Sequence, residues 1–349
     1  MALGAVAEPP VQRRGSDYAQ LSRRISQAGL LERRPASYVA RIVLTLGAFV
    51  AGWVAVFLVG DSWWQVPLAA LMAVATTQVA FLGHDAGHRQ MFRRRGPSEL
   101  VGLVAGNLAV GLSYGWWVDK HNRHHANPNH EDEDPDVGAG ALVWTPEQAL
   151  ETRGFGRWMA QRQAYFFFPM LFLEGLSLHV ASIRAIVGRS DGRYNTPMRH
   201  RAVEAVLFVA HTVGYVALLL AVMSPGKALL FAVVHQGLWG LYMGCAFAPN
   251  HKGMPMPTAD EELDFLRKQV LTSRNVRGSR FVDTALGGLN YQIEHHLFPN
   301  MPRSNLRRAQ PIVRAYCAEQ GVSYAETGLV ESYRQALGHL HEVGRPLRG

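Results

Sequence analysis

Four apolar runs of membrane-spanning length constrain the fold of this 349-residue chain more than any other feature. They cover residues 38–59, 64–83, 202–223 and 228–248. A helix of about 20 apolar residues crosses the hydrocarbon core of a bilayer. A lipid-exposed backbone must satisfy its own hydrogen bonds, which a helix does. The runs therefore predict an all-α integral membrane protein; two pairs of helices buried in a soluble protein are the alternative.

The four runs are predicted to form two hairpins, because short turn sequences separate the members of each pair. Gly60-Asp61-Ser62 follows the first run and Ser224-Pro225-Gly226-Lys227 follows the third. Trp63 and Trp64 are expected at a membrane interface. Each hairpin returns the chain to the side of residues 1–37, a basic arm, and Arg93-Arg94-Arg95 follows the second run. Positive charge marks the cytoplasmic side, so we expect a multi-pass protein with this face in the cytoplasm.

Two other apolar segments fit a membrane span less well. Residues 98–118 are Gly-rich, and a full span there would carry the chain to the opposite face, so we expect a re-entrant or interfacial helix. Residues 165–187 include Pro169, Glu174 and Arg184, a mixture that predicts an amphipathic interfacial helix. We therefore expect a basic arm (1–37), a membrane domain (38–310) and a cytoplasmic helical tail (311–349).

Three clusters of polar side chains recur at helical spacing. They are His84/His88, His121/His124/His125 and Gln292/His295/His296. Residues three and four apart share one face of a helix, and imidazole is a ligand for iron, zinc, copper and nickel. Seven histidines exceed the four ligands of a structural zinc ion. If the hairpins bring the clusters to one membrane face, they predict a site for two metal ions; solvated histidine-rich turns are the alternative.

The composition restricts the expected metal ligands and the expected partner. Only Cys245 and Cys317 are present, so nitrogen and oxygen are the expected metal ligands. The formal net charge is +8, but no nucleic-acid-binding motif accompanies it and the basic residues flank apolar runs. A membrane surface, and not nucleic acid, is the expected partner.

The clusters and their surroundings resemble the integral membrane fatty acid desaturases. The resemblance covers roughly residues 38–310 and is densest at His84–His88, Lys120–Asp136 and Gly287–Pro302. The third cluster is similar to the QxxHH form found in front-end desaturases and some actinobacterial acyl-CoA desaturases. The resemblance implies a non-haem di-iron centre that uses O2 to introduce a cis double bond into a fatty acyl chain. The iron ligands that it implies are His84, His88, His121, His124, His125, His251, His295 and His296.

Residues near these ligands have less certain roles. Gln292 stands where other family members have histidine. It is expected to bind iron weakly, through water or not at all, and Asn250 beside His251 is a weaker candidate. Asp85 and Glu294 either hydrogen-bond the outer nitrogens of ligand histidines or lie exposed. The acidic run 131–136 has the same two interpretations. We expect His235 to be a core residue and assign no role to His130, His179 and His211.

The resemblance also implies partners. The substrate is expected to be an acyl-CoA or an acyl-lipid. Basic residues would bind its head group or anionic lipid, namely Lys120, Arg123, Lys252, Arg303, Arg307 and Arg308. The sequence lacks the HPGG motif of a fused cytochrome b5 domain, so electrons are expected from a separate ferredoxin or cytochrome b5-like donor with an NAD(P)H reductase.

Three other functions remain open. A membrane hydroxylase of alkyl chains would carry the same clusters. A haem protein would need histidines paired between two membrane helices, and a metal transporter would need polar ligands in mid-membrane. Here the histidines lie at the ends of the apolar runs, which favours the di-iron enzymes.

Overall fold

The fold is predominantly helical. The structure is a computed structural model that describes residues 16–188, 198–258 and 260–348. In these ranges the expected all-α class needs one correction, because β1 (Asn275–Arg277) pairs in parallel with β2 (Glu326–Gly328). This short ladder joins the segment before the third histidine cluster to the chain that follows it.

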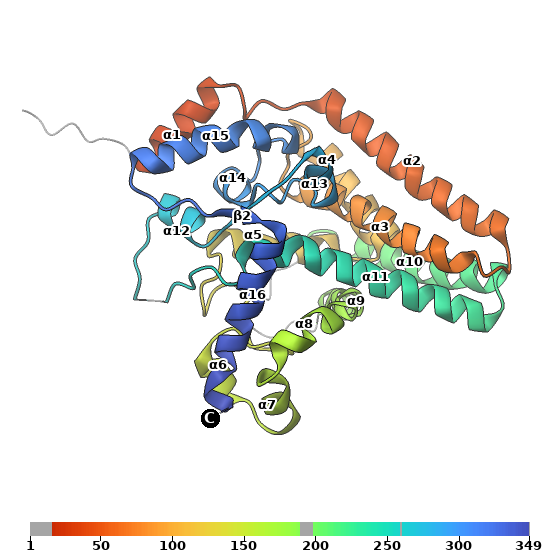
Figure 1. Cartoon of the computed structure of the whole chain (residues 1–349). Coiled ribbons are helices and arrows are strands. Elements are labelled where there is room, and N and C mark those ends of the chain that lie inside the picture. Colours follow the sequence, from red (N-terminus) through yellow and green to blue (C-terminus); the bar gives the residue numbers. More distant parts are fainter. Residues whose placement is uncertain (1–15, 189–197, 259, 349) are drawn as a thin grey trace, which may run out of the picture.

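Four long helices form one end of the molecule (Figure 1). They are α2 (Pro35–Val59), α3 (Gln65–Gly87), α10 (Arg201–Val222) and α11 (Pro225–His251), and each is long and apolar enough to cross a membrane. Large apolar side chains such as Leu44, Phe57 and Val206 are exposed on them. Exposed apolar surface on this scale is expected where a helix faces lipid.

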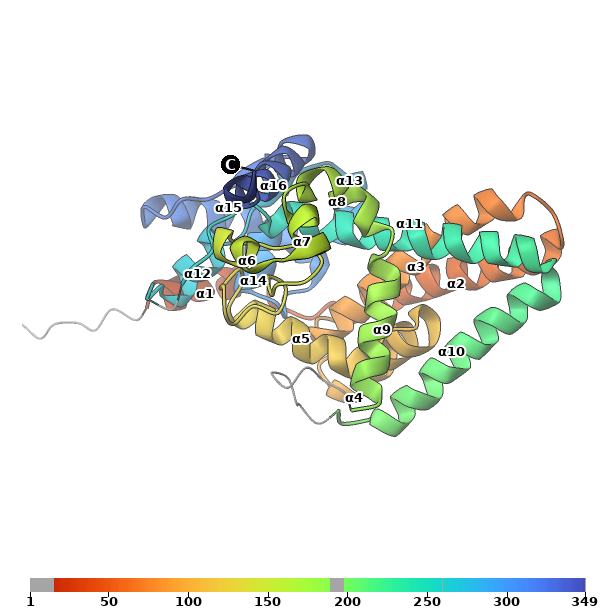
Figure 2. The same cartoon turned by 90° about the horizontal axis from the view of Figure 1, so that it is seen from below.

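The two helix pairs meet at their turns. The backbone N–H of Ser224 donates to Asp61 Oδ1 at 3.0 Å, and Lys227 Nζ donates to the Asp61 carbonyl at 2.9 Å. From this end α11 runs along α3, whereas α10 diverges from both (Figure 2). The core between the helices includes Phe231 and Trp239. Polar groups at the opposite end of α3 and α11 are thereby brought side by side.

The segment predicted to be re-entrant is sharply bent. It comprises α4 (Arg95–Leu103), the π-helical η1 (Val104–Val110) and α5 (Tyr114–Ala126). The helices on either side of Gly111 meet at 110°, and Gly111 has a φ of +78° that favours glycine. A single straight span over these residues is therefore excluded.

The prediction of a single helix over 165–187 was wrong. The structure has two helices, α8 (Gln163–Leu171) and α9 (Glu174–Ile186), which meet at 71°. The chain turns because α9 packs closely on α11: a Cβ at Gly240 would lie 2.6 Å from the backbone nitrogen of Gly175. Exposed apolar side chains do line both helices, including Tyr165, Leu176 and Ile183.

Shorter helices form a layer at the other end of the long helices (Figure 1). They are α1 (Asp17–Gln27), α6 (Pro146–Glu151), α7 (Gly154–Ala160), α12 (Phe265–Leu271), α13 (Arg280–Ala285), α14 (Gln292–Leu297), α15 (Arg303–Glu319), α16 (Leu329–Val343) and η2 (Arg345–Leu347). In the basic arm, α1 buries Leu21 and Ile25 against α15. This part of the arm therefore packs on protein; residues 1–15 lie outside the described residues.

The expected boundary after residue 310 falls inside α15, so it does not separate two units. The following helix, α16, packs on α8 and α11. Tyr333 of α16 donates its hydroxyl to the carbonyl of Cys245 at 2.6 Å, which fixes it to the long helix α11. Residues 311–349 are thus packed against the rest of the chain as far as they are described.

Candidate metal centre

Four chain segments bring the eight candidate histidines together. His84 lies in the last turn of α3 and His88 caps its end. The α5 helix carries His121, His124 and His125, α11 ends at His251, and α14 carries His295 and His296. Six of the eight are buried, while His121 and His125 are partly exposed. The helical spacing seen in the sequence therefore places these side chains on inward faces.

The first group consists of His84, His88, His121 and His295. One ring nitrogen of each lies within 4.8 Å of those of the others. Nε2 of His84, His88 and His295 is buried and has no hydrogen-bond partner among the described residues. Leaving a buried polar atom unpaired costs about 1–3 kcal/mol. Converging imidazole nitrogens without other partners therefore fit a site in which they would bind a metal ion.

The second group consists of His124, His251 and His296. Nε2 of His251 lies 3.3 Å from Nε2 of His124 and 3.1 Å from Nε2 of His296. His125 lies between the groups, because its Nε2 is 3.1 Å from Nε2 of His121 and its ring stacks on His296 with centroids 4.1 Å apart. Two groups of imidazoles that are linked through His125 fit two neighbouring metal ions.

Hydrogen bonds at the outer nitrogens orient the second group. His251 Nδ1 donates to the Thr272 carbonyl at 3.0 Å, and His296 Nδ1 donates to Gln269 Oε1 at 2.9 Å. His124 Nδ1 donates to Asp134 Oδ2 at 2.9 Å. A donor at Nδ1 leaves the lone pair on Nε2, which faces inward. Such outer partners fix the ring and raise its basicity as a ligand.

The electrostatics of His295 and His296 agree with neutral ligands. Burial, with a further contribution from neighbouring imidazoles, holds the pKa of His295 and of His296 well below the ordinary value. Both rings are therefore uncharged at neutral pH and offer a lone pair. Imidazole alone does not choose among iron, zinc, copper and nickel.

The less certain candidates differ in whether their side chains contact the two histidine groups. Gln292 contacts the second group, since its Nε2 lies 2.8 Å from Nε2 of His251, and Asn250 Nδ2 lies 3.4 Å from Gln292 Oε1. Asp85 lies 3.5 Å from His84 Nδ1 and forms a 2.8 Å ion pair with Arg303.

Glu294 does not meet the expectation of a bond to a ligand histidine. It points away from both groups and accepts hydrogen bonds from Asn275 Nδ2 and the Tyr324 hydroxyl, each at 2.7 Å. Glu294 does not share the face of α14 that carries His295 and His296. Its side chain is nevertheless fully buried. Burial raises the pKa of this carboxyl to about 7.

Five of the six basic residues proposed to bind a head group have protein partners. Arg303 is buried and paired with Asp85, so it is not available at the surface. Lys120 pairs with Asp136, Arg123 with Asp119, and Arg307 with Asp283. Lys252 lies 3.9 Å above the Trp144 ring. Arg303 was wrongly assigned, because its spacing from the third cluster gave no sign of the buried carboxylate of α3.

Other residues around the site follow from the structure and not from sequence patterns. Asp134 favours the orienting interpretation of the acidic run, whereas Asp132 and Glu133 in the same run are exposed. Gln269 lies in α12 and Thr272 directly after it, and no sequence pattern there indicates a role at the site. His235 is held between Thr76 and Tyr215 at 3.0 Å from each, as expected of a core residue.

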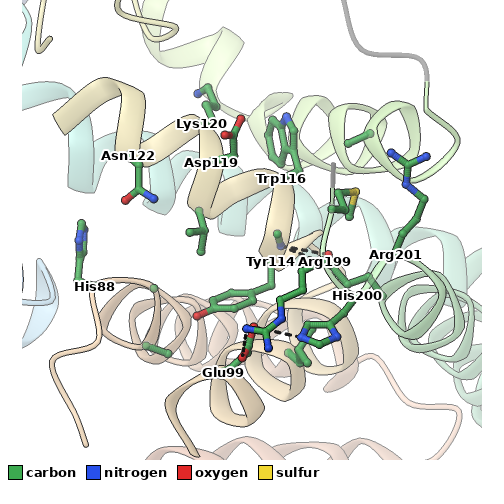
Figure 3. Close-up of a pocket in the computed structure, with 18 of the residues that line it drawn as sticks. His88, Glu99, Tyr114, Trp116, Asp119, Lys120, Asn122, Arg199, His200 and Arg201 are labelled. Carbon is green, nitrogen blue, oxygen red and sulfur yellow. Dashed lines mark hydrogen bonds and ion pairs between the residues drawn. The ribbon is translucent and has the colours of Figure 1, made fainter. Parts of the chain in front are cut away.

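A cavity of about 860 Å³ opens beside the first histidine group (Figure 3). His88 lies at one end of it, and Tyr114, Glu99, Arg199 and His200 lie around the other. Seven basic and three acidic side chains line it. The basic ones are Arg89, Arg95, Lys120, Arg123, Arg184, Arg199 and Arg201. Glu99 is shared by Arg95, Arg199 and His200 at 3.2–3.5 Å.

A second, much smaller cavity of about 30 Å³ lies against His84. Its lining is almost entirely apolar and includes Val110, Leu112, Met243 and Phe247. Together the two cavities reach the first histidine group from a charged side and from an apolar side.

Comparison with known proteins gives a consistent match. The fatty acid desaturase family model matches residues 61–328. The "Acyl-lipid (9-3)-desaturase" of Physcomitrium patens is 33% identical over 287 residues, which are 79% of this chain and 52% of that protein. "Fatty acid desaturase 3" of Bos taurus is 30% identical, over 88% of this chain and 68% of that protein. The Delta(6)-fatty-acid desaturase of Caenorhabditis elegans is 27% identical, over 95% and 75%. The chain spans about half the length of the moss relative.

Proposed function

The chain belongs to the fatty acid desaturase family, and we propose that it introduces a cis double bond into a fatty acyl chain at a two-iron centre. The reaction removes two hydrogens from adjacent methylenes. With O2, two electrons and two protons, it yields the alkene and two waters. Side-chain acid–base chemistry does not break an unactivated C–H bond; bound iron supplies that oxidising power.

The observation that carries this proposal is the meeting of eight imidazoles in two adjoining groups. His84, His88, His121 and His295 would hold one iron, and His124, His251 and His296 the other, with His125 at the border. The protein's part is to hold these imidazoles so that their inner nitrogens face the metal ions. Asp134, Gln269 and Thr272 orient the rings from outside the second group.

We propose that the large cavity receives the anionic head group of the substrate. Arg89, Arg184 and Arg201 line it, and no ion pair is seen for them within the described ranges. Guanidinium groups fit the phosphates of coenzyme A, which they contact bidentately. The cavity extends to His88, so a bound head group would lead its acyl chain to the metal centre. An acyl-CoA is our preferred substrate; a phospholipid-linked acyl chain has the same phosphate chemistry.

The proposed orientation places the metal centre on the cytoplasmic side. It is supported by the position of the histidines at the ends of α3 and α11 away from the two turns. The basic run Arg93-Arg94-Arg95, between α3 and the start of α4, supports it too. There a separate ferredoxin or cytochrome b5-like protein, reduced by an NAD(P)H-dependent reductase, would deliver electrons.

Expression in a host of known lipid profile, followed by mass spectrometry of the acyl chains, tests the function. We expect a product lighter by two hydrogens with a cis double bond, absent in His124→Ala and His295→Ala variants that still insert into the membrane. A product that gains an oxygen instead would refute desaturation and favour hydroxylation. Supplying purified enzyme with acyl-CoA or with acyl-phospholipid separates the two substrates.

A further inference from the structure

The two cavities reach different members of the same histidine group. The large cavity contacts His88 and the small one contacts His84, and both imidazoles belong to the first group. If the proposed function holds, the reacting methylenes lie beside this group. The charged cavity then takes the head-group end of the chain, and the apolar cavity can take only methylenes beyond the reacting pair. Its volume of about 30 Å³ accepts little more than a water-sized group.

Tyr114 lies at the boundary between the cavities. Of the described residues, it alone lines both of them. Its ring projects into the large cavity between His88 and Glu99 (Figure 3). Trp117, one turn later in α5, lines only the small cavity and stacks on the ring of His121 with centroids 4.5 Å apart. Tyr114 therefore lies between the charged and the apolar space.

The position of this ring is fixed by its surroundings. A Cβ at Gly102 would lie 2.2 Å from Tyr114 Cζ, and a Cβ at Gly106 would lie 3.3 Å from Tyr114 Cβ. Two glycines thus make the space that the ring fills. The backbone N–H of Tyr114 also donates to Asn107 Oδ1 at 3.2 Å. The two glycines and the backbone hydrogen bond thus fix the ring on one side, while its other side faces the large cavity.

We propose that Tyr114 is a specificity-determining residue, whose ring limits how far the acyl chain passes the metal centre and so selects the position of the double bond. This inference rests on the proposed desaturase function. One methylene in an apolar pocket is worth about 10–200-fold in discrimination. Removal of the ring joins the two cavities and admits at least one further register of the chain.

Product analysis of purified variants with one acyl substrate tests the proposal. In Tyr114→Ala we expect the ratio of the two most abundant positional isomers to change at least about tenfold. Tyr114→Phe keeps the ring and should keep the wild-type ratio. Tyr165→Ala, the same truncation at a residue that lines neither cavity, should also keep it. Iron content is measured in every variant, so that a loss of metal is not read as a loss of specificity.

An unchanged isomer ratio in an iron-loaded, active Tyr114→Ala enzyme would overturn the proposal and leave the desaturase function intact. If Tyr114→Ala loses its iron, Gly102→Ala decides the question. Its new methyl group must displace the Tyr114 ring, so the ratio should again change about tenfold, and an unchanged ratio overturns the proposal. Absence of any double bond in the wild-type product would instead refute the proposed function.

Discussion

Asp134 and His124 form a buried hydrogen bond, with Asp134 Oδ2 2.9 Å from His124 Nδ1. Both side chains are almost fully buried. The same carboxylate accepts the backbone N–H groups of Asn129 and Asp136 at 2.7 and 2.8 Å, so the loop holds it in place. One acidic residue of the loop thereby fixes a histidine of the second group, and the direction of its Nε2.

Replacing this carboxylate should weaken metal binding. Asp134→Asn removes the charged acceptor, and loss of such an outer partner typically costs 10–100-fold in metal affinity. Chelator titration of the purified protein measures the effect. Asp132→Asn, an exposed position in the same loop, is the control and should bind metal like the wild type. Equal affinity in the two variants would show that Asp134 does not orient a ligand.

Two histidines of α11 should respond differently to truncation. His251 belongs to the second group, whereas His235 lies between Thr76 and Tyr215 in the core. We expect His251→Ala to lose iron and activity, and His235→Ala to keep its iron and lose stability through its two broken hydrogen bonds. Metal analysis of both variants checks this. Iron loss in His235→Ala at unchanged thermal stability would contradict the assignment.

Glu204 should stabilise α5, the helix that carries His121, His124 and His125. This carboxylate of α10 is 2% exposed and accepts from Ser113 Oγ at 2.7 Å, from the Gly115 N–H at 3.1 Å and from Asn107 Nδ2 at 3.2 Å. It thus caps the N-terminus of α5. Glu204→Gln turns an acceptor into a donor that faces other donors, which should cost about 1–3 kcal/mol.

Thermal unfolding in detergent measures this change. Glu262→Gln, at an exposed position outside any helix, should unfold like the wild type. If Glu204→Gln unfolds at the wild-type temperature, the capping role is wrong.

Substitutions of Arg303 and of Arg184 should have different effects, because we assign a structural role to Arg303 and a substrate-binding role to Arg184. Arg303→Met leaves the buried Asp85 without its cation, which should destabilise the fold by about 3–5 kcal/mol. Arg184→Gln, in the large cavity, should raise the KM for acyl-CoA several-fold at unchanged stability. Unfolding curves and steady-state kinetics of both variants make the comparison. A raised KM without destabilisation in Arg303→Met would restore Arg303 as a head-group residue.

The sequence indicated the helices and the clusters of the site better than it indicated their partners. Apolar length is a local property, so the four long helices and their turns near residues 61 and 224 could be predicted. Helical spacing likewise predicted which histidines share a face. The bend between η1 and α5, and the break between α8 and α9, depend on close packing at glycines such as Gly240, which a single sequence does not reveal.

Partners that are distant in the chain escaped prediction. Gln269 and Thr272 contact the second group only because α12 folds back against α14. Arg303 reaches Asp85 across more than two hundred residues, and nothing in its local sequence distinguishes it from a surface arginine. Of the acidic run, only the fold shows that Asp134 turns inward while Asp132 faces solvent.

Metal analysis of the purified wild-type protein tests the central claim most directly. The account predicts two iron ions per chain, with the content reduced in His295→Ala, which truncates the first group, and in His124→Ala, which truncates the second. A single bound ion, a full complement of another metal, or two irons retained in both variants would contradict it.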